Sequence, residues 1–215
     1  MVRRTKQDVV AEFRSTEILD AARRVFARKG FEGASVDEVA DAAGLAKGTV
    51  YTYFPSKRDL YLAALHQGIS ELMEETRRNV DAAGSTAEKL RAFIATRIRY
   101  AEADRDFVTI YHAEFGPVHP ASLKKEFKQL YQQQMGVLEA VIEQGMARGE
   151  LRRVSANAAA FLVCEATRSF NGRRLLGWSR GKAEEDIDFL FELIWKGLAA
   201  ASKRTSPGEA RCVTH

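Results

Sequence analysis

The chain has 215 residues, 46% of them hydrophobic, which suffices for a medium-sized domain with a smaller one beside it and excludes a disordered chain. The formal net charge of +4 comes from 33 Lys and Arg against 29 Asp and Glu, a mildly basic balance that says little about nucleic acid by itself. Two cysteines exclude a disulfide framework and a cysteine-rich metal site. No apolar run approaches the ~20 residues that cross a bilayer, and the first residues lack the apolar core of a signal peptide, so we expect a cytoplasmic protein without a membrane partner.

Residues 1–12 carry basic side chains ahead of any clear helical periodicity, at Arg3, Arg4 and Lys6. Two interpretations stay open. The segment is a frayed tail, or it is a basic arm that adds phosphate or minor-groove contacts to DNA. The salt dependence of DNA binding separates them, because an arm on DNA contributes phosphate contacts.

A helix is predicted over residues 15–29. An apolar stripe recurs there at helical spacing, and Gly30 follows it, a residue type that ends helices at little conformational cost. The stripe consists of Ile18, Ala22, Val25 and Phe26. We expect the basic residues of this helix to be solvated charges: Arg23, Arg24, Arg28 and Lys29.

The segment 35–57 predicts two short helices joined by a tight turn. Ser35 followed by Glu38 is a capping box, which fixes a helix start. Gly44 ends that helix, because glycine adopts the left-handed conformation at little cost. A second helix is expected from about 46 to 54.

The second of these helices has an outward face without large or acidic side chains. At 100° per residue, Val50 and Phe54 share the inward face, whereas Gly48 and Thr52 point away from it. A small outward residue lets the backbone approach another surface closely, and hydroxyl groups bond to base edges or phosphates. Hydroxyl groups and positive charge flank this face at Lys47, Thr49, Tyr51, Tyr53 and Lys57.

The run from Ile18 to Leu60 resembles the DNA-binding region of TetR-family transcriptional regulators. The resemblance is carried by Ile18, Ala22, Phe26, Gly30-Phe31, Val39-Ala40, Ala43-Gly44-Leu45, Lys47-Gly48-Thr49-Val50-Tyr51, Tyr53-Phe54 and Ser56-Lys57 with Leu60. It implies phosphate contacts from Thr49, Tyr53 and Lys57. It implies a major-groove face made of Lys47, Gly48, Tyr51 and Thr52, and we add Ser35 to the expected DNA-binding residues.

One position departs from the family pattern. Ala46 stands where the family commonly has Ser or Thr, so the helix that faces DNA lacks a side-chain N-cap. Losing such a cap typically costs ~0.5–2 kcal/mol of helix stability. The departure therefore bears on the affinity for DNA rather than on the resemblance.

Four further helices are predicted from apolar periodicity, capping residues and breaks, at about 56–79, 86–103, 107–115 and 120–148. The first begins in the DNA-binding unit and continues beyond it, so it links that unit to whatever follows. Ser85 with Glu88 is a second capping box at the start of the next helix. We divide the chain into a DNA-binding domain at 1–56, a ligand-binding and dimerisation domain at 57–202, and a disordered tail at 203–215.

The last two predicted helices, at 155–177 and 183–201, are apolar on more than one side. A helix that is apolar beyond one stripe is buried or lies in an interface. We expect matching helices of two subunits to form a four-helix bundle around a two-fold axis, making a homodimer. The expected interface residues are Val163, Ala166, Phe170, Phe189 and Leu193.

Helices rich in aromatic residues lie between the DNA-binding unit and the expected dimer helices. By resemblance, this region binds a small effector that releases DNA, and its pattern is similar to that of acyl-CoA-responsive members. The candidate lining residues are Arg97, Tyr100, Phe107, Tyr111, His112, Phe115, Tyr131, Gln134, Phe161, Glu165 and Arg168. The plainer interpretation of each aromatic residue is core packing, and Glu165 and Arg168, spaced i, i+3, suit a local ion pair.

The sequence thus predicts an all-α protein with an N-terminal helix-turn-helix, no cofactor and no metal. Its function would be that of a dimeric repressor on double-stranded operator DNA, released by an apolar or amphipathic effector. One alternative is a DNA-binding regulator that needs no effector. An all-α enzyme is the other, disfavoured because His112 and Glu114 diverge on a helix and no glycine-rich phosphate loop has the required spacing.

Overall fold

The computed structural model describes residues 5–114 and 124–200, without the side chains of residues 6, 7 and 124–131. The described residues form nine helices and no strand, so the all-α prediction is confirmed. No helix among them is both long and apolar enough to span a bilayer. The helices are α1 (Lys6–Gly33), α2 (Val36–Ala43), α3 (Lys47–Tyr53), α4 (Lys57–Ala82), α5 (Thr86–Ala103), α6 (Arg105–Glu114), α7 (Lys124–Ala147), α8 (Ala156–Leu175) and α9 (Ala183–Leu198).

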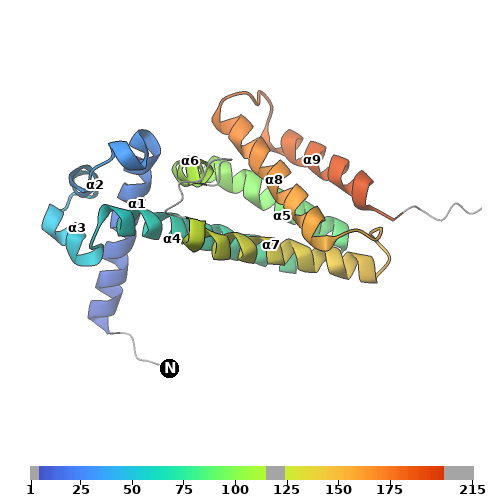
Figure 1. The fold of residues 1–215 in the computed structure, drawn as a ribbon, viewed down its shortest axis with the longest axis horizontal. Helices are drawn as coiled ribbons and strands as arrows, with labels where there is room; N and C mark the ends of the chain where they lie inside the picture. The colour runs from blue at the N-terminus through green and yellow to red at the C-terminus, as the bar shows by residue number, and fades with distance from the viewer. Residues whose placement is uncertain (1–4, 115–123, 201–215) are drawn as a thin grey trace, which may run out of the picture.

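The helices are arranged as a small unit beside an elongated body. Figure 1 shows α1, α2 and α3 grouped at one end, while α4 leads from this group into the body. In the body, α4 and α7 run lengthwise, and α8 and α9 form a hairpin on the far side of α5. The predicted tail at 203–215 lies outside the described residues.

The predicted helix starts are set by side-chain caps. Ser35 with Glu38 and Ser85 with Glu88 both form complete capping boxes, and Ser56 accepts a hydrogen bond from the Asp59 backbone N–H at the start of α4. Gly44 follows α2 with φ of 67°, in the left-handed region that glycine reaches without strain. The helix-turn-helix boundaries therefore follow from local chemistry.

The helix α1 begins nine residues earlier than the predicted start at 15. Thr5 caps it and forms a capping box with Asp8, so residues 6–12 are helical rather than frayed. Val9, Val10 and Phe13 are 53–65% exposed there, which explains why no inward stripe marked this turn. Arg3 and Arg4 lie outside the described residues, as does the side chain of Lys6.

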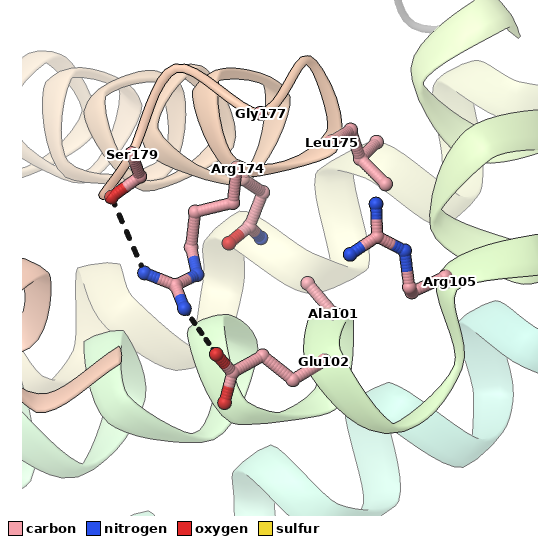
Figure 2. A pocket seen from close by; sticks show the side chains of 8 residues that line it. Ala101, Glu102, Arg105, Arg174, Leu175, Gly177 and Ser179 are labelled. Atoms are coloured by element: carbon pink, nitrogen blue, oxygen red, sulfur yellow. Dashed lines mark hydrogen bonds and ion pairs between the residues drawn. The ribbon is translucent and has the colours of Figure 1, made fainter. Parts of the chain in front are cut away.

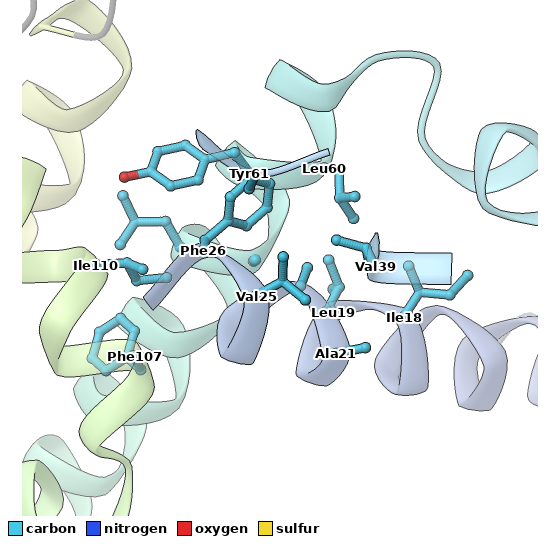
Figure 3. Close-up of a cluster of buried hydrophobic side chains, with 14 of the residues drawn as sticks. Ile18, Leu19, Ala21, Val25, Phe26, Val39, Leu60, Tyr61, Phe107 and Ile110 are labelled. Carbon is cyan, nitrogen blue, oxygen red and sulfur yellow. The ribbon is translucent and has the colours of Figure 1, made fainter. Parts of the chain in front are cut away.

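One hydrophobic core joins the small unit to the body. Figure 3 shows Phe26, Val39 and Leu60 in the same cluster as Phe107 and Ile110 of α6, and all five side chains are buried. This core therefore continues beyond residue 56, where the sequence suggested a domain boundary. Any displacement of α6 changes contacts that hold α1 and α4 together.

The closest approach in this joint lies between α4 and α6. A Cβ atom placed on Gly68 would lie 2.2 Å from the Phe107 ring, so α6 packs here only because Gly68 has no side chain. The Phe107 ring is fully buried and meets the Tyr100 ring at 5.7 Å between centres. Gly68 thus fixes how near α6 lies to α4.

A polar cluster at the same joint corrects one expectation. Arg23 is only 7% exposed rather than solvated. Its guanidinium pairs with Asp20 of its own helix at 2.6 Å, Glu71 of α4 at 3.1 Å and Asp104 at the end of α5 at 3.0 Å. Burial alone would lower the pKa of Arg23, but the hydrogen bond to Asp20 and the charges of Glu71 and Asp104 outweigh it and raise the pKa. Arg23 therefore ties three helices together at the edge of the shared core.

A second core fills the body between α5, α7, α8 and α9. Its fully buried members include Ile94, Ile98, Leu138, Val163 and Ile187. The segments that directly follow α7 and α9 meet at an isolated antiparallel bridge between Leu151 and Ala199. The hairpin α8–α9 is thus anchored on the side that faces α5 and α7.

Candidate nucleic-acid interface and buried polar centre

The surface of α3 is arranged as its sequence predicts. Val50 is fully buried and anchors the helix, whereas Gly48 and Thr52 are exposed and Tyr51 is 41% exposed. A Cβ atom on Gly48 would meet no other atom within 4 Å, so this part of the helix is open to an approaching surface. The predicted outward face of α3 is therefore confirmed as an exposed face.

Positive charge lies beside this face at Lys47. Its ammonium forms an ion pair with Asp37 of α2 at 2.8 Å, and that hydrogen bond raises the pKa of Lys47. Both side chains are more than half exposed, so the pair contributes little to stability. An approaching phosphate would compete with Asp37 for this ammonium group.

Lys57 lies in a different setting. Its ammonium donates hydrogen bonds to the carbonyl oxygens of Glu32 at 3.2 Å and Ala34 at 2.9 Å, and it lies 4.7 Å from the centre of the Phe31 ring. These contacts satisfy carbonyl groups at the end of α1. Lys57 therefore stabilises the junction of α1 and α4, in addition to any contact with phosphate.

The remaining predicted DNA-binding residues have mainly local partners. The Ser35 hydroxyl accepts the Glu38 N–H at the start of α2, and the Thr52 hydroxyl donates to the Gly48 carbonyl at 3.0 Å. Thr49 is half-buried, and Tyr53 is half-buried against the first core. At the start of α3, Ala46 provides no side-chain cap, as its sequence requires.

Three of the predicted effector residues converge in the interior of the body. Arg97 of α5 donates to the side-chain oxygen of Gln134 in α7 at 3.0 Å, and the Tyr111 hydroxyl of α6 donates to the same oxygen at 3.1 Å. Arg97 is 6%, Tyr111 5% and Gln134 3% exposed. Asn171 of α8 joins them by donating to the Arg97 carbonyl oxygen at 3.2 Å. We call Arg97, Tyr111, His112, Gln134 and Asn171 the polar centre.

His112 completes this polar centre as a neutral side chain. Burial, followed by the charge of Arg168, lowers its pKa to about 4. A Cβ atom on Gly172 of α8 would lie 3.2 Å from the His112 ring, so the two helices approach closely here. Burial likewise raises the pKa of Tyr111, which keeps its hydroxyl a hydrogen-bond donor.

The polar centre contains buried polar atoms that have no hydrogen-bond partner. They belong to three of its side chains and are Nε2 of His112, Nε2 of Gln134 and Oδ1 of Asn171. Such groups are uncommon in protein interiors, because each loses its bonds to water on burial. A bound molecule or water supplies the missing partners in such a site.

The other predicted effector residues lie in several places. Glu165 and Arg168 of α8 form the local ion pair that their spacing allows, and Tyr100 and Phe107 lie at the joint between α4 and α6. Phe161 is 51% exposed on α8 and lines no interior site. Phe115 and the side chain of Tyr131 lie outside what the structure describes.

Two buried polar residues were missed at the level of sequence. Asn171 lies three positions after Arg168 on α8, a spacing that placed it on the same side of the helix. Glu114 is 5% exposed, and one of its oxygens accepts a hydrogen bond from the Tyr61 hydroxyl in the first core. Nothing in the local pattern distinguishes Glu114 from a solvated residue at a helix end.

A pocket of about 260 Å³ lies where the ends of α5 and α8 meet the start of α6, and Asn171 of the polar centre is among the residues that line it. Figure 2 shows Arg174 reaching toward Glu102 and Ser179, with Arg105 on the other side of the pocket. Arg174 also pairs with Asp186 at 2.7 Å, so its charge is compensated within the protein. None of the predicted effector residues lines this pocket.

The helices α8 and α9 each carry large apolar side chains that are exposed. Phe161, Leu162, Phe189 and Leu193 are 51–63% exposed. Of the predicted interface residues, Phe189 and Leu193 belong to this surface, whereas Ala166 and Phe170 are half-buried against the second core. Val163 is fully buried and contributes nothing to the surface. The sequence placed Phe161 in the interior and Val163 at the interface, and the structure has the reverse. Residues two apart on a helix differ by about 200° in direction, so a wrong orientation of α8 exchanges the two.

Comparison with known proteins identifies both parts of the chain. Residues 18–64 match the profile of the bacterial regulatory proteins of the tetR family, and residues 83–171 match a tetracyclin repressor-like C-terminal domain. The chain is 30% identical over 145 residues to the HTH-type transcriptional repressor KstR2 of Rhodococcus jostii, which covers 64% of this chain and 70% of that protein.

A sequence match and a structure match from Bacillus subtilis extend this result. The fatty acid metabolism regulator protein is 23% identical over 136 residues, or 63% of this chain and 70% of that protein. The crystal structure of the transcriptional regulator FadR in complex with stearoyl-CoA has a TM-score of 0.78 at 19% identity, covering 85% of this chain and 98% of that one. With the helix-turn-helix and the helical body both matched, the chain belongs to the TetR family and is a DNA-binding transcriptional regulator.

Proposed function

We propose that the protein is a homodimeric repressor that binds operator DNA through α3 of each subunit and releases it when a small amphipathic effector binds in the body. The observation that carries the DNA-binding part is the exposed face of α3, open at Gly48 and flanked by Lys47 and Tyr51. Base edges in the major groove are read by side chains on such a helix. The predicted contacts from Ser35, Thr49, Thr52, Tyr53 and Lys57 belong to this proposal.

The exposed apolar surface of α8 and α9 supports a dimer. Phe161, Leu162, Phe189 and Leu193 lie on neighbouring helices of one hairpin and expose more than half of their surface. A contiguous apolar surface of this kind usually marks an interface. Two such hairpins related by a two-fold axis would form a four-helix bundle. The dimer would then present two α3 helices to half-sites ~34–36 Å apart.

The polar centre supports an effector site in the body. Three buried polar atoms without partners lie between α5, α6, α7 and α8, beside the apolar second core. The related FadR structure holds stearoyl-CoA, and two of the relatives are named as a fatty acid metabolism regulator and KstR2. A lipid-like molecule with one polar end suits a site made of buried donors and apolar walls.

The joint around α6 supports coupling between the two sites. Tyr111 and His112 of the polar centre lie on α6, and Phe107 and Ile110 of the same helix belong to the core shared with α1 and α4. An effector that prefers one position of α6 would shift the population toward that position. The effect on DNA affinity can be no larger than the effector's differential affinity for the two states.

Selection of binding sequences from a random DNA pool tests the DNA-binding part of the proposal. The expected result is enrichment of two inverted half-sites with centres about one DNA turn apart. Enrichment of single half-sites would contradict the dimer, and no enrichment at moderate salt would contradict sequence-specific binding. If no tested amphipathic molecule changes the affinity for the selected sequence, the result would favour the alternative, a DNA-binding regulator that needs no effector.

A further inference from the structure

Arg97 holds a guanidinium group in the interior without an opposite charge. The residue is 6% exposed, and its side chain contacts the neutral Gln134 oxygen and the Phe93 ring, whose centre lies 5.2 Å from the guanidinium carbon. Among the side chains that the structure describes, which exclude those of residues 124–131, no acidic one forms an ion pair with Arg97. Burying a charge in this way is costly unless a counter-charge accompanies it.

Two other arginines, one buried and one half-buried, show what Arg97 lacks. Arg23 pairs with Asp20, Glu71 and Asp104, and Arg174 pairs with Glu102 and Asp186. Their charges are therefore compensated within the protein. Arg97 has no such partner among the described side chains, so its guanidinium is open to an anionic group of another molecule.

The charged side chains near Arg97 are bonded to other partners. Arg168 is compensated by Glu165, and His112 is neutral near pH 7. Glu139 is half-buried and accepts a hydrogen bond from Asn157 on α8. The nearest unused donor is the Gln134 amide nitrogen, which is buried and has no hydrogen-bond partner.

We infer that the effector binds with an anionic oxygen group, a carboxylate or a phosphate, held by the Arg97 guanidinium and the Gln134 amide. This inference rests on the proposed effector-responsive function and adds the chemical class of the ligand's polar end. A guanidinium presents paired N–H groups that match two oxygens of one carboxylate or phosphate. A free acid offers a carboxylate, and an acyl-CoA offers phosphates, so the chemistry is shared and the source is left to experiment.

Release of the selected operator by matched ligands tests the inference. The ligands are palmitate, palmitoyl-CoA and methyl palmitate, with cholate and methyl cholate as a ring-containing pair, all below their critical micelle concentrations. We expect at least one anionic ligand to release DNA at a concentration about tenfold lower than its neutral ester, as a charged hydrogen bond predicts. If palmitate releases DNA in this way, the group that binds is a carboxylate. If palmitoyl-CoA does so instead, the group is a phosphate.

Variants of Arg97 assign the effect to this residue. Arg97→Met should abolish the difference between anionic and neutral ligands, and Arg97→Lys should keep part of it because the charge remains. Arg99→Met is the matched control on the same helix, since Arg99 is exposed and pairs with Glu184 at the surface. Thermal unfolding verifies that each variant folds, and Arg97→Gln, which also lacks the charge, serves if Arg97→Met does not fold.

The outcomes separate the inference from the proposed function. Equal release by charged and neutral ligands, or a difference that persists in a folded Arg97 variant without the charge, overturns the anionic group and leaves the effector response standing. No release by any ligand, with operator affinity intact, overturns the effector response and the inference with it. Loss of the difference in Arg99→Met as well as in Arg97→Met also overturns the assignment to Arg97.

Discussion

Individual residues of the helix-turn-helix combine DNA contact with local structure. Lys57 is an expected phosphate contact, yet its ammonium group holds two carbonyl oxygens at the end of α1. Ser35 likewise caps α2. Replacing either residue would therefore change the shape of the unit as well as its contacts with DNA. Base recognition is best tested at a residue that does not also stabilise the unit. Tyr51, exposed on α3, is such a residue.

The missing cap of α3 makes a prediction at the residue scale. Ala46→Thr should stabilise the protein by ~0.5–2 kcal/mol, because its hydroxyl can accept an N–H group of the first turn. Ala46 already has the extended backbone of an N-cap residue, with φ of −71° and ψ of 142°. Urea unfolding measures the gain. Ala46→Val has the same shape without the oxygen, and an equal gain from it would show that capping is not the cause.

At the scale of single residues, the face of α3 was predictable and the interior of the body was not. Helical periodicity gives the direction of Val50 and Gly48 because α3 is short and packs on one side. The helix α8 packs on α5, α6 and α7 at once, so its apolar residues do not form one stripe. The sequence therefore placed Phe161 in the interior and Val163 at the surface, the reverse of their positions in the structure. Only tertiary packing decides between them.

At the scale of elements, the helix α6 links the DNA-binding unit to the body. This helix contributes Phe107 and Ile110 to the core of the DNA-binding unit, and Tyr111 to the polar centre. Its sequence predicted a short aromatic helix but gave no indication of which helices it contacts. The close approach at Gly68, far away along the chain, sets that position.

Gly68 supports a prediction at the scale of this joint. Gly68→Ala should destabilise the protein, although alanine favours helices by ~1 kcal/mol over glycine, because the new methyl group would lie 2.2 Å from the Phe107 ring. Gly136 of α7 is the control, since a Cβ atom there meets nothing within 4 Å. Gly136→Ala should therefore stabilise the protein in the same unfolding measurement. A gain of stability at both positions would contradict the close packing of α6.

At the scale of the whole molecule, the fold was largely predictable because several helices begin at a side-chain cap or end at a glycine. Capping boxes at Ser35 and Ser85 and the turn at Gly44 mark most of the boundaries that matter for the DNA-binding unit. The start of α1 was missed because its first turns bury nothing. The joint, the two cores and the Arg23 cluster depend on contacts between distant segments, which periodicity does not report.

The dimer makes a prediction at this scale. Leu193→Glu places a charge on the exposed surface of α9 and should convert the protein to a monomer, because desolvating an unpaired carboxylate opposes association. Operator affinity should fall with it, since two half-sites no longer bind together. Sedimentation equilibrium measures the change of mass. Val10→Glu is the control, an equally exposed apolar residue on α1. A dimer that survives Leu193→Glu would contradict the assigned surface.

The most direct test of sequence reading by α3 compares Tyr51→Ala with Lys47→Ala on selected and random DNA at one salt concentration. We predict that Tyr51→Ala lowers affinity for the selected sequence by ~1–3 kcal/mol more than for random DNA. Lys47→Ala removes a positive charge that flanks this face, so it should weaken binding to both DNAs alike and reduce the salt dependence of binding. Equal losses on both DNAs for Tyr51→Ala would contradict the assignment of this face to base reading.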